Sequence, residues 1–332
     1  MSSQPKSFWG QYGRWLPGFI ISAAALYVVV RMTNWEELKL AFASIQVGYL
    51  VLAETIFIAA VALRGLAWKI LLNGKASVKQ TFFVINIGYL LNNILPFRVG
   101  ELARAVFLGK DTGLGMVNVL STIVIERSFD LAISASFVLT TLPLVLGLSW
   151  AGIAAWITLG LVCLGLFTLY LVARNYAIVE GWFERWGNHS SFINKYILPQ
   201  VRNFLNGLSV LTRPSQFILS LLLLVVTWLM TAGEYYIVMR CFVPQAIYWW
   251  PIFTVGILAL GIALPSAPAA LGLWEGAMVV ALSLLGVSES VALAYAILMH
   301  FLHFTLNGLL GLYGLFREGR SFSSIMADLG IR

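Results

Sequence analysis

Charged side chains are scarce in this chain of 332 residues, because Asp, Glu, Lys and Arg together make up 11% of it. A soluble domain carries about 25% charged residues. Hydrophobic residues make up 60% of the chain, so water is not its main solvent. Several apolar segments approach the roughly 20 residues that a helix needs to cross a bilayer. The composition therefore predicts an all-α fold, with one polytopic membrane domain over residues 1–332.

The sequence also lacks the patterns of metal centres, disulfide frameworks and common enzymes. Its two cysteines, Cys163 and Cys241, form no CxxC pair. No glycine-rich nucleotide loop, HExxH or GxSxG pattern occurs. We therefore expect no metal, no cofactor and no catalytic residues. A transferase reaction inside the membrane stays open, because paired carboxylates and arginines could serve one.

Basic residues outnumber acidic ones, with 21 Lys and Arg against 14 Asp and Glu. In a membrane protein such an excess lies in loops, where it orients the chain and contacts anionic headgroups. We therefore expect these side chains to meet a membrane surface and no nucleic acid. Counted over the short loops, the Lys and Arg residues place both termini on the cytoplasmic side.

Six apolar segments are predicted to span the membrane without interruption: 16–30, 48–72, 116–148, 153–173, 216–240 and 291–316. The first of them follows Lys6 and Arg14, as in a secretory signal, but no small-residue cleavage site comes after it. We therefore expect a retained first helix.

Two further apolar stretches, 80–109 and 250–287, are interrupted by proline and then carry a carboxylate after a glycine. Residues 92–101 read NNILPFRVGE and residues 264–275 read LPSAPAALGLWE. A proline in mid-segment leaves backbone groups unpaired in lipid unless protein or water covers them. This favours re-entrant hairpins over pairs of ordinary spans.

The two predicted hairpins face opposite sides of the membrane. The positions of the Lys and Arg residues indicate that the first hairpin enters from the cytoplasmic side and the second hairpin from the other side. Opposed broken helices are typical of inverted repeats that meet around a substrate near the midplane. The sequence therefore predicts two inverted halves, at about 16–148 and 153–316.

Residues 193–211 have apolar side chains at helical spacing, with polar and basic side chains between them. This pattern is typical of an amphipathic helix that lies flat in the membrane interface. A simple connector helix is the alternative.

Ionisable groups inside apolar segments are costly and are therefore candidates for function. Those of this chain are Glu54, Arg64, Arg98, Glu101, Arg104, Glu126, Arg127, Asp130, Glu234 and Glu275. Arg98 and Arg104 each stand three residues from Glu101, so on a helix that begins after Pro96 the three share one face. Two guanidinium groups around one carboxylate, beside a helix N-terminus, suit a phosphate. A closed ion-pair network is the alternative.

Glu126 and Asp130 stand four residues apart, with Arg127 between them. Because Arg127 can neutralise only part of that charge, we expect Arg64 or Arg104 to approach from another helix, with internal pairing as the alternative. The residues expected to bind substrate are Arg64, Asn93, Arg98, Glu101, Arg104, Glu126, Arg127, Asp130 and Glu275.

His300 and His303 stand three residues apart in the last apolar segment, a spacing that suits two metal ligands. No third ligand is evident in the sequence. We therefore expect the two imidazoles to pack or to form hydrogen bonds.

Four sets of residues carry a resemblance to a known family. They are Ala62-Leu63-Arg64 with Trp68 and Leu71-Leu72; Asn92 to Pro96 with Arg98, Gly100, Glu101 and Arg104; Glu126-Arg127 with Asp130-Leu131; and Pro268 with Leu271-Gly272 and Glu275-Gly276. Together they resemble the membrane region of lysylphosphatidylglycerol synthases and the free-standing flippase-like proteins related to it. The chain departs from the common pattern at Phe97 and at Ala269-Ala270, where small residues or glycine are usual.

The resemblance covers nearly the whole chain and implies that the protein moves a lipid headgroup between the leaflets of a prokaryotic plasma membrane. The family's soluble lysyl-transferring domain has no counterpart in this sequence, so we expect the chain not to act as a synthase. The implied partner is an anionic phospholipid or a polyprenyl-phosphate glycolipid, and a homo-oligomer stays open. The alternatives are an intramembrane component of polyprenyl-phosphate sugar transfer and an accessory subunit without transport of its own.

Overall fold

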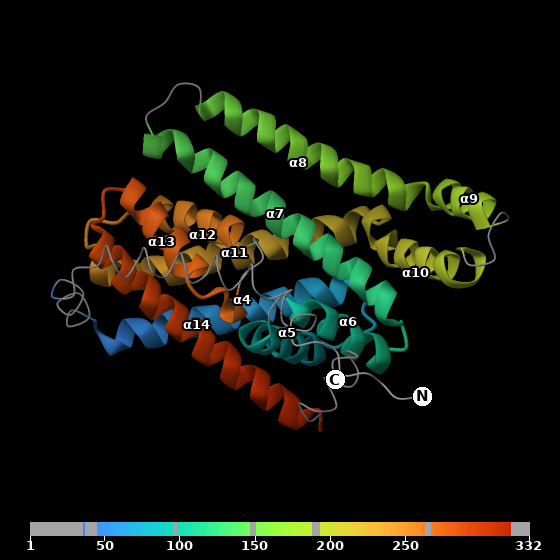
Figure 1. Ribbon diagram of the computed structural model, residues 1–332, viewed down its shortest axis with the longest axis horizontal. Coiled ribbons are helices and arrows are strands. Elements are labelled where there is room, and N and C mark those ends of the chain that lie inside the picture. The colour runs from blue at the N-terminus through green and yellow to red at the C-terminus, as the bar shows by residue number, and fades with distance from the viewer. Residues whose placement is uncertain are drawn as a thin grey trace, which may run out of the picture.

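The computed structural model describes residues 45–95, 98–146, 151–187, 193–262 and 267–319, together with Glu36. In these residues all regular structure is helical, and eleven α-helices follow one another as α4 to α14 (Figure 1). The predicted all-α class is confirmed. The predicted first span, 16–30, lies outside the described residues.

Four helices are long and apolar enough to cross a membrane: α4 (Val47–Leu71), α7 (Met116–Leu146), α11 (Pro214–Phe242) and α14 (Glu289–Arg317). They coincide with four of the predicted spans. Helix α8 (Ala151–Arg174) matches a fifth, and it qualifies as a span together with α9 (Tyr176–Gly187), from which a bend of 73° separates it. The described residues thus contain four candidate spans, or five with the bent pair, where the sequence predicts about six over the whole chain.

The two proline-containing stretches form short helices that pack against each other in pairs. The first pair is α5 (Val78–Ile94) with α6 (Val99–Asp111), and the second is α12 (Trp249–Gly261) with α13 (Leu273–Leu284). At 1.5 Å per residue the longest of the four measures about 25 Å, which is less than the roughly 30 Å of a hydrocarbon core. The predicted interruptions are therefore real breaks, and each break joins two helices that are short for a full crossing.

The backbone is strained next to both breaks. Arg98, directly before α6, has φ of 52°, and Ala269 and Ala270 have φ of 57° and 55°. The two alanines belong to a short 3₁₀ turn, Pro268–Ala270, that precedes α13. Left-handed backbone costs a residue with a Cβ atom about 1–2 kcal/mol. Packing around the breaks must therefore hold these residues in place.

The two arms of the first pair touch through glycine. A Cβ atom on Gly100 of α6 would lie 2.0 Å from the Gly88 carbonyl oxygen of α5 and 2.6 Å from Oδ1 of Asn92. The Gly100 N–H donates a hydrogen bond of 2.8 Å to that same Asn92 oxygen. Small residues let helix backbones approach closely in membranes. This contact fixes how α6 folds back on α5.

Apolar side chains fill the space between the helices in two main clusters. The first joins α4, α5, α6, α7 and α11 through Trp68, Leu91, Phe107, Phe129 and Leu224. The second joins α4, α11, α12, α13 and α14 through Ala53, Tyr235, Leu258, Met278 and Met299. Helix α4 packs along α11, and α5 packs along α14. Helices α4 and α11 therefore take part in both clusters.

The predicted amphipathic segment 193–211 is helical, with a π-helical turn at Ile193–Ile197, α10 at Leu198–Leu208 and a 3₁₀ turn at Ser209–Thr212. Arg202 of α10 donates hydrogen bonds to Glu180 and to Glu184 of α9, the latter at 2.6 Å. The hydrogen bond to Glu180, followed by that to Glu184, raises the pKa of Arg202. The placement of this segment in the membrane interface stays a prediction.

We predict that Gly100→Ala destabilises the protein by about 1–3 kcal/mol, the usual cost of overpacking. The added methyl group has no room beside the Gly88 carbonyl oxygen. Thermal unfolding of the purified protein in detergent measures the change.

The matched control is Gly308→Ala in α14, where a Cβ atom meets no atom of the described residues within 4 Å. Alanine favours a helix interior over glycine by up to about 1 kcal/mol, so this variant should unfold at or above the wild-type temperature. Equal unfolding temperatures for Gly100→Ala and wild type would contradict the close glycine contact.

Candidate functional site

Glu126 of α7 is fully buried and accepts hydrogen bonds from three arginines. Arg64 Nε lies 2.7 Å from Oε1, a terminal nitrogen of Arg127 lies 3.0 Å from the same oxygen, and a terminal nitrogen of Arg104 lies 2.5 Å from Oε2. Arg64 belongs to α4 and Arg104 to α6. One carboxylate therefore joins three helices.

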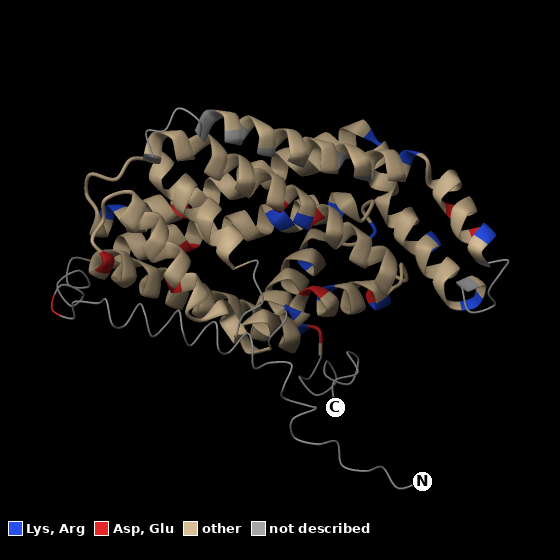
Figure 2. Ribbon diagram, turned by 45° about the horizontal axis from the view of Figure 1, so that its top comes forward, with Lys and Arg blue, Asp and Glu red and all other residues tan. Residues whose placement is uncertain are grey.

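Asp130, one turn further along α7, extends this network. It accepts hydrogen bonds from Arg64 and, at 2.8 Å, from the indole Nε1 of Trp228 on α11, and it forms an ion pair with Arg127 at 3.3 Å. We call Arg64, Arg104, Glu126, Arg127 and Asp130 the arginine cluster. Figure 2 shows basic and acidic residues next to each other in the middle of the molecule, where most of the ribbon is uncharged.

The surroundings of Arg104 explain why a long charged side chain fits inside the helices. Its guanidinium carbon lies 4.1 Å above the centre of the Trp68 ring, a favourable cation–π distance. Trp68 is held by a hydrogen bond of 3.0 Å from its Nε1 to Thr122. A Cβ atom on Gly88 would lie 2.8 Å from Cγ and Cδ of Arg104. Glycine at this position therefore makes room for the arginine stem.

The arginine cluster holds three guanidinium groups and two carboxylates, which leaves one surplus positive charge. Nε of Arg104 and Nε of Arg127 are buried and have no hydrogen-bond partner among the residues that the structure describes. The side chain of Arg127 is 35% exposed, whereas those of Arg64 and Arg104 are buried. Arg127 is therefore the member of the cluster that an anion can reach.

The expected approach of Arg64 or Arg104 to the acidic pair on α7 is confirmed, and both arginines make it. The expected grouping of Arg98, Glu101 and Arg104 is wrong for Arg104, because Arg104 pairs with Glu126. Arg98 precedes the helix with left-handed backbone and so does not continue the helical face that the spacing assumes. Glu101 accepts a hydrogen bond of 3.3 Å from the Asn92 side chain.

The two breaks meet in space. A terminal nitrogen of the exposed Arg98 donates a hydrogen bond of 2.6 Å to the carbonyl oxygen of Ile262, where α12 ends. Helix α5 packs against the turn Pro268–Ala270, and Nδ2 of Asn93 lies 3.4 Å from the carbonyl oxygen of Phe304 in α14. Arg98 also lies within electrostatic range of Arg127 and Asp130. The meeting point of the breaks is therefore next to the arginine cluster.

Glu275 lies at the second break but away from the arginines. Its Oε2 accepts a hydrogen bond of 2.8 Å from the Gly272 N–H, and its Oε1 lies 2.6 Å from Nδ1 of His300. The imidazole of His300 stacks on the Trp274 ring at 4.7 Å. The buried Glu275 thus fixes the start of α13 against α14.

A second histidine pair was missed by sequence reasoning. His303 Nε2 lies 2.5 Å from Oε1 of Glu234 in α11. Both histidines therefore make hydrogen bonds, which is one of the two roles, packing or hydrogen bonding, that the sequence predicts for them. The spacing of His300 and His303 placed both on one face of α14, and Glu234 stood out as an ionisable group in an apolar segment. The partners of the two histidines lie 25 and 69 residues away in sequence. No local pattern connects groups so far apart.

A bundle of long apolar helices with two broken helix pairs and buried ion pairs defines a multi-pass helical membrane protein. Residues 15–311 match the family model of the lysylphosphatidylglycerol synthase transmembrane region. The chain belongs to this family. Comparisons with curated proteins and with solved structures give no match.

We predict that Glu126→Gln destabilises the protein by about 3–5 kcal/mol, the usual cost of removing one partner from a buried ion pair. The amide keeps the shape of the side chain but leaves three guanidinium groups facing Asp130 alone. Thermal unfolding in detergent and the yield of folded protein measure this loss.

The control is Glu184→Gln, because the Glu184 side chain is 48% exposed and also pairs with an arginine. An exposed ion pair contributes about 0–1 kcal/mol. If Glu126→Gln unfolds at the same temperature as Glu184→Gln, the arginine cluster does not stabilise the helices.

Proposed function

We propose that this protein moves a phosphate-bearing lipid headgroup between membrane leaflets while the lipid tail stays in the bilayer. The headgroup belongs to a phospholipid or to a polyprenyl-linked glycolipid. The observation that carries the proposal is the surplus positive charge of the arginine cluster beside the meeting point of the two breaks. A charge inside a membrane protein is costly unless an opposite charge faces it. Phosphate is an anion that guanidinium groups bind in bidentate geometry.

The arginines differ in how much of each side chain is exposed, and this difference assigns each of them a role in binding. Arg98 is exposed and Arg127 is partly exposed, so these two contact the phosphate. Arg64 and Arg104 are buried and already bonded to carboxylates, so they position Glu126 and Asp130. Asn93, Glu101 and Glu275 act at the breaks, where each forms a hydrogen bond to another segment or holds a helix end.

The short helix pairs act as re-entrant hairpins that enter from opposite faces. The limited length of α5, α6, α12 and α13 and the packing of each pair support this arrangement. Broken helices that meet near the midplane place polar backbone groups and charges where a headgroup crosses. The proposed topology has both termini in the cytoplasm and about six spanning helices.

The test is lipid exchange in liposomes that contain the purified protein and no sugar donor. A fluorescent lipid becomes accessible to dithionite once it reaches the outer leaflet, so quenching measures the exchange rate. Phospholipid and polyprenyl-phosphate lipids are tried in parallel. Exchange of either lipid supports the proposal. Product formed from an added sugar donor, with no lipid exchanged, would favour sugar transfer in its place.

We predict that Arg98→Gln weakens binding of the anionic lipid, and with it exchange at limiting lipid, by about 10-fold or more. A hydrogen bond to a charged group contributes about 1.5–3 kcal/mol. Arg98→Lys should recover part of the rate, because lysine keeps the charge but loses the planar fork.

Lys75→Gln is the charge-matched control, since Lys75 is exposed in the loop between α4 and α5. This variant should exchange lipid at the wild-type rate. Thermal unfolding of each variant separates loss of function from loss of fold. Wild-type exchange by Arg98→Gln would exclude Arg98 from the lipid site.

We predict that the loops before the first hairpin and after the second face opposite sides. Single cysteines replace Lys75 and Ser288 in a background of Cys163→Ser and Cys241→Ser, and an impermeant maleimide labels intact cells and inverted vesicles. Both positions are exposed.

Lys75→Cys should react only in inverted vesicles and Ser288→Cys only in intact cells. Labelling of both positions from the same side would rule out opposed hairpins. Labelling after the membrane is dissolved in detergent is the control for reactivity at each position.

A further inference from the structure

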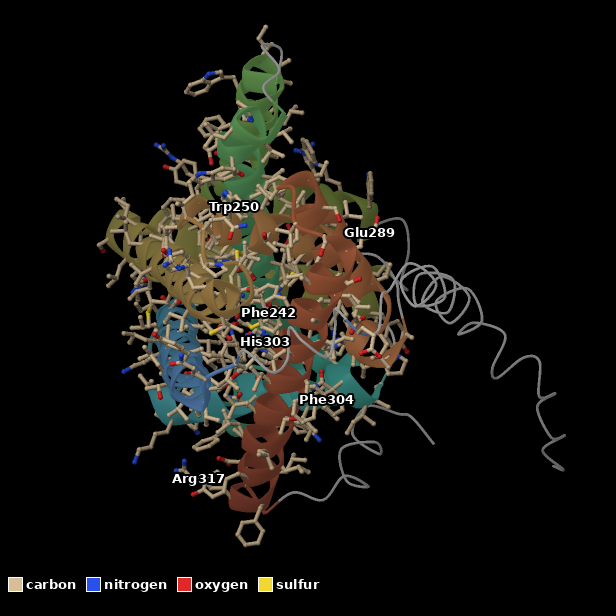
Figure 3. The ribbon with its side chains drawn as sticks, turned by 90° about the vertical axis from the view of Figure 1, so that its left-hand side faces the viewer. Phe242, Trp250, Glu289, His303, Phe304 and Arg317 are labelled. Carbon is tan, nitrogen blue, oxygen red and sulfur yellow. The ribbon has the colours of Figure 1, made fainter. Side chains whose placement is uncertain are left out.

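A carboxylate and an imidazole meet in the interior, away from the arginine cluster. His303 stands fourteen residues from Glu289 and fourteen from Arg317, the two ends of α14. Figure 3 shows it in the interior, between these two labelled ends. Its Nε2 lies 2.5 Å from Oε1 of Glu234, which is fully buried in α11. At 1.5 Å per residue His303 is about 21 Å from either end of its helix.

Glu54 of α4 is the third member of this site. It lies within electrostatic range of both His303 and Glu234. Both of its carboxylate oxygens are buried, as is Oε2 of Glu234, and none of the three has a hydrogen-bond partner among the described residues. We call Glu54, Glu234 and His303 the buried acid site.

Aromatic rings pack around His303 in the buried acid site. The ring of Phe57 stacks on His303 at 4.5 Å, and Trp274 and Tyr235 meet it edge-on. The titratable groups that face the site are Tyr235 from α11, Tyr295 from α14 and the pair formed by Glu275 of α13 with His300. No lysine or arginine forms an ion pair with its carboxylates in the described part of the chain.

The charges of the three side chains determine how many protons the buried acid site must bind to be neutral. Two carboxylates and one imidazole carry no net charge when two protons are shared among them. We assign one of these protons, bound in addition to the imidazole's own N–H, to the Glu234–His303 pair, as an imidazolium facing a carboxylate or a neutral imidazole facing a carboxylic acid. Glu54 then stays negative unless it binds a cation. An ionised carboxylate without a hydrogen-bond donor is strongly disfavoured in an apolar interior.

We infer that Glu54, Glu234 and His303 form a proton-binding site, in which Glu54 carries a proton at neutral pH. A metal ion is the other cation that carboxylates and imidazole bind. In the described residues, however, no three His, Cys, Asp or Glu side chains are placed to hold one. A proton needs a single oxygen atom and no coordination shell, so it fits the site as built.

Two helices of this site also contact the arginine cluster: α4 carries Arg64, and Trp228 of α11 donates to Asp130. Glu54 and Arg64 are ten residues apart on α4, and Trp228 and Glu234 are six apart on α11. Loss of the proton leaves a negative charge between helices that pack tightly on the cluster. This step rests on the proposed function. Proton binding to Glu54 therefore changes the relative energies of the states of the protein between which the lipid headgroup moves.

The test of the site is infrared difference spectroscopy of the purified protein, in which a protonated carboxyl group absorbs apart from an ionised one. Wild-type protein at neutral pH should show a protonated carboxyl band that disappears on alkaline titration. Glu54→Gln should lack this band. Glutamine has the shape and charge of a protonated glutamate, so this variant should fold.

Two further variants complete the spectroscopic test. His303→Gln should shift the pH at which the band titrates, because it removes the partner of Glu234. Glu184→Gln, which alters an exposed carboxylate, should leave the band as in wild type. Absence of the band from wild type, or its persistence in Glu54→Gln, would overturn the assignment.

Lipid exchange under a pH gradient tests the link to transport. The wild-type rate should change when the gradient is imposed, and the Glu54→Gln rate should not respond. Exchange in wild type that ignores the gradient would overturn the link and leave the proton site supported by its infrared band. Absence of exchange with every lipid would overturn the proposed function, and the infrared result would still decide the proton site.

Discussion

The ion pairs that converge on Glu126 hold together helices that are otherwise joined mostly through apolar side chains. In lipid, helices gain little from burying apolar surface against each other, so polar contacts and close packing matter more. Glu126 joins α7 to α4 and α6, and Asp130 adds α11 through Trp228. Because a charge that loses its partner inside a membrane protein is costly, these four helices must move together if they move at all. The hydrogen bonds that Arg98 and Asn93 donate from the first break are accepted by backbone carbonyl oxygens.

This division gives the molecule a fixed part, made of the helices that Glu126 and Asp130 join. The fixed part contains α4 and α11, which pack along each other and also form the buried acid site with α14. Glu54 and Arg64 lie about 15 Å apart along α4, since each residue adds 1.5 Å. Coupling between two sites needs an element whose arrangement both sites influence. The α4 and α11 pair is in contact with both sites. Helix α4 carries Arg64 and Glu54, and α11 carries Glu234 together with Trp228, which donates to Asp130.

Sequence reasoning located the elements well because membrane spans are long and apolar, and their ends are marked by loops. It also found the acidic pair on α7, because a four-residue spacing is a local feature of a helix. It also grouped Arg104 with Glu101, and it gave Glu234 no partner, because the partners of both residues lie on other helices. Which arginine reaches which carboxylate depends on how helices are packed and on space left by residues such as Gly88. These are properties of the assembled bundle, and single-sequence spacing carries no information on them.

The hydrogen bond from Arg98 to Ile262 has a consequence for the order of events during binding. On the proposed function, this hydrogen bond is the contact that an arriving headgroup meets, because Arg98 joins the two breaks by donating to a carbonyl oxygen. An arriving phosphate is a stronger acceptor and draws the same side chain away. The carbonyl that is set free lies at a helix end, where water or a new donor can reach it. On the proposed function, phosphate binding and loss of the contact between the two breaks are therefore a single exchange of acceptors by Arg98.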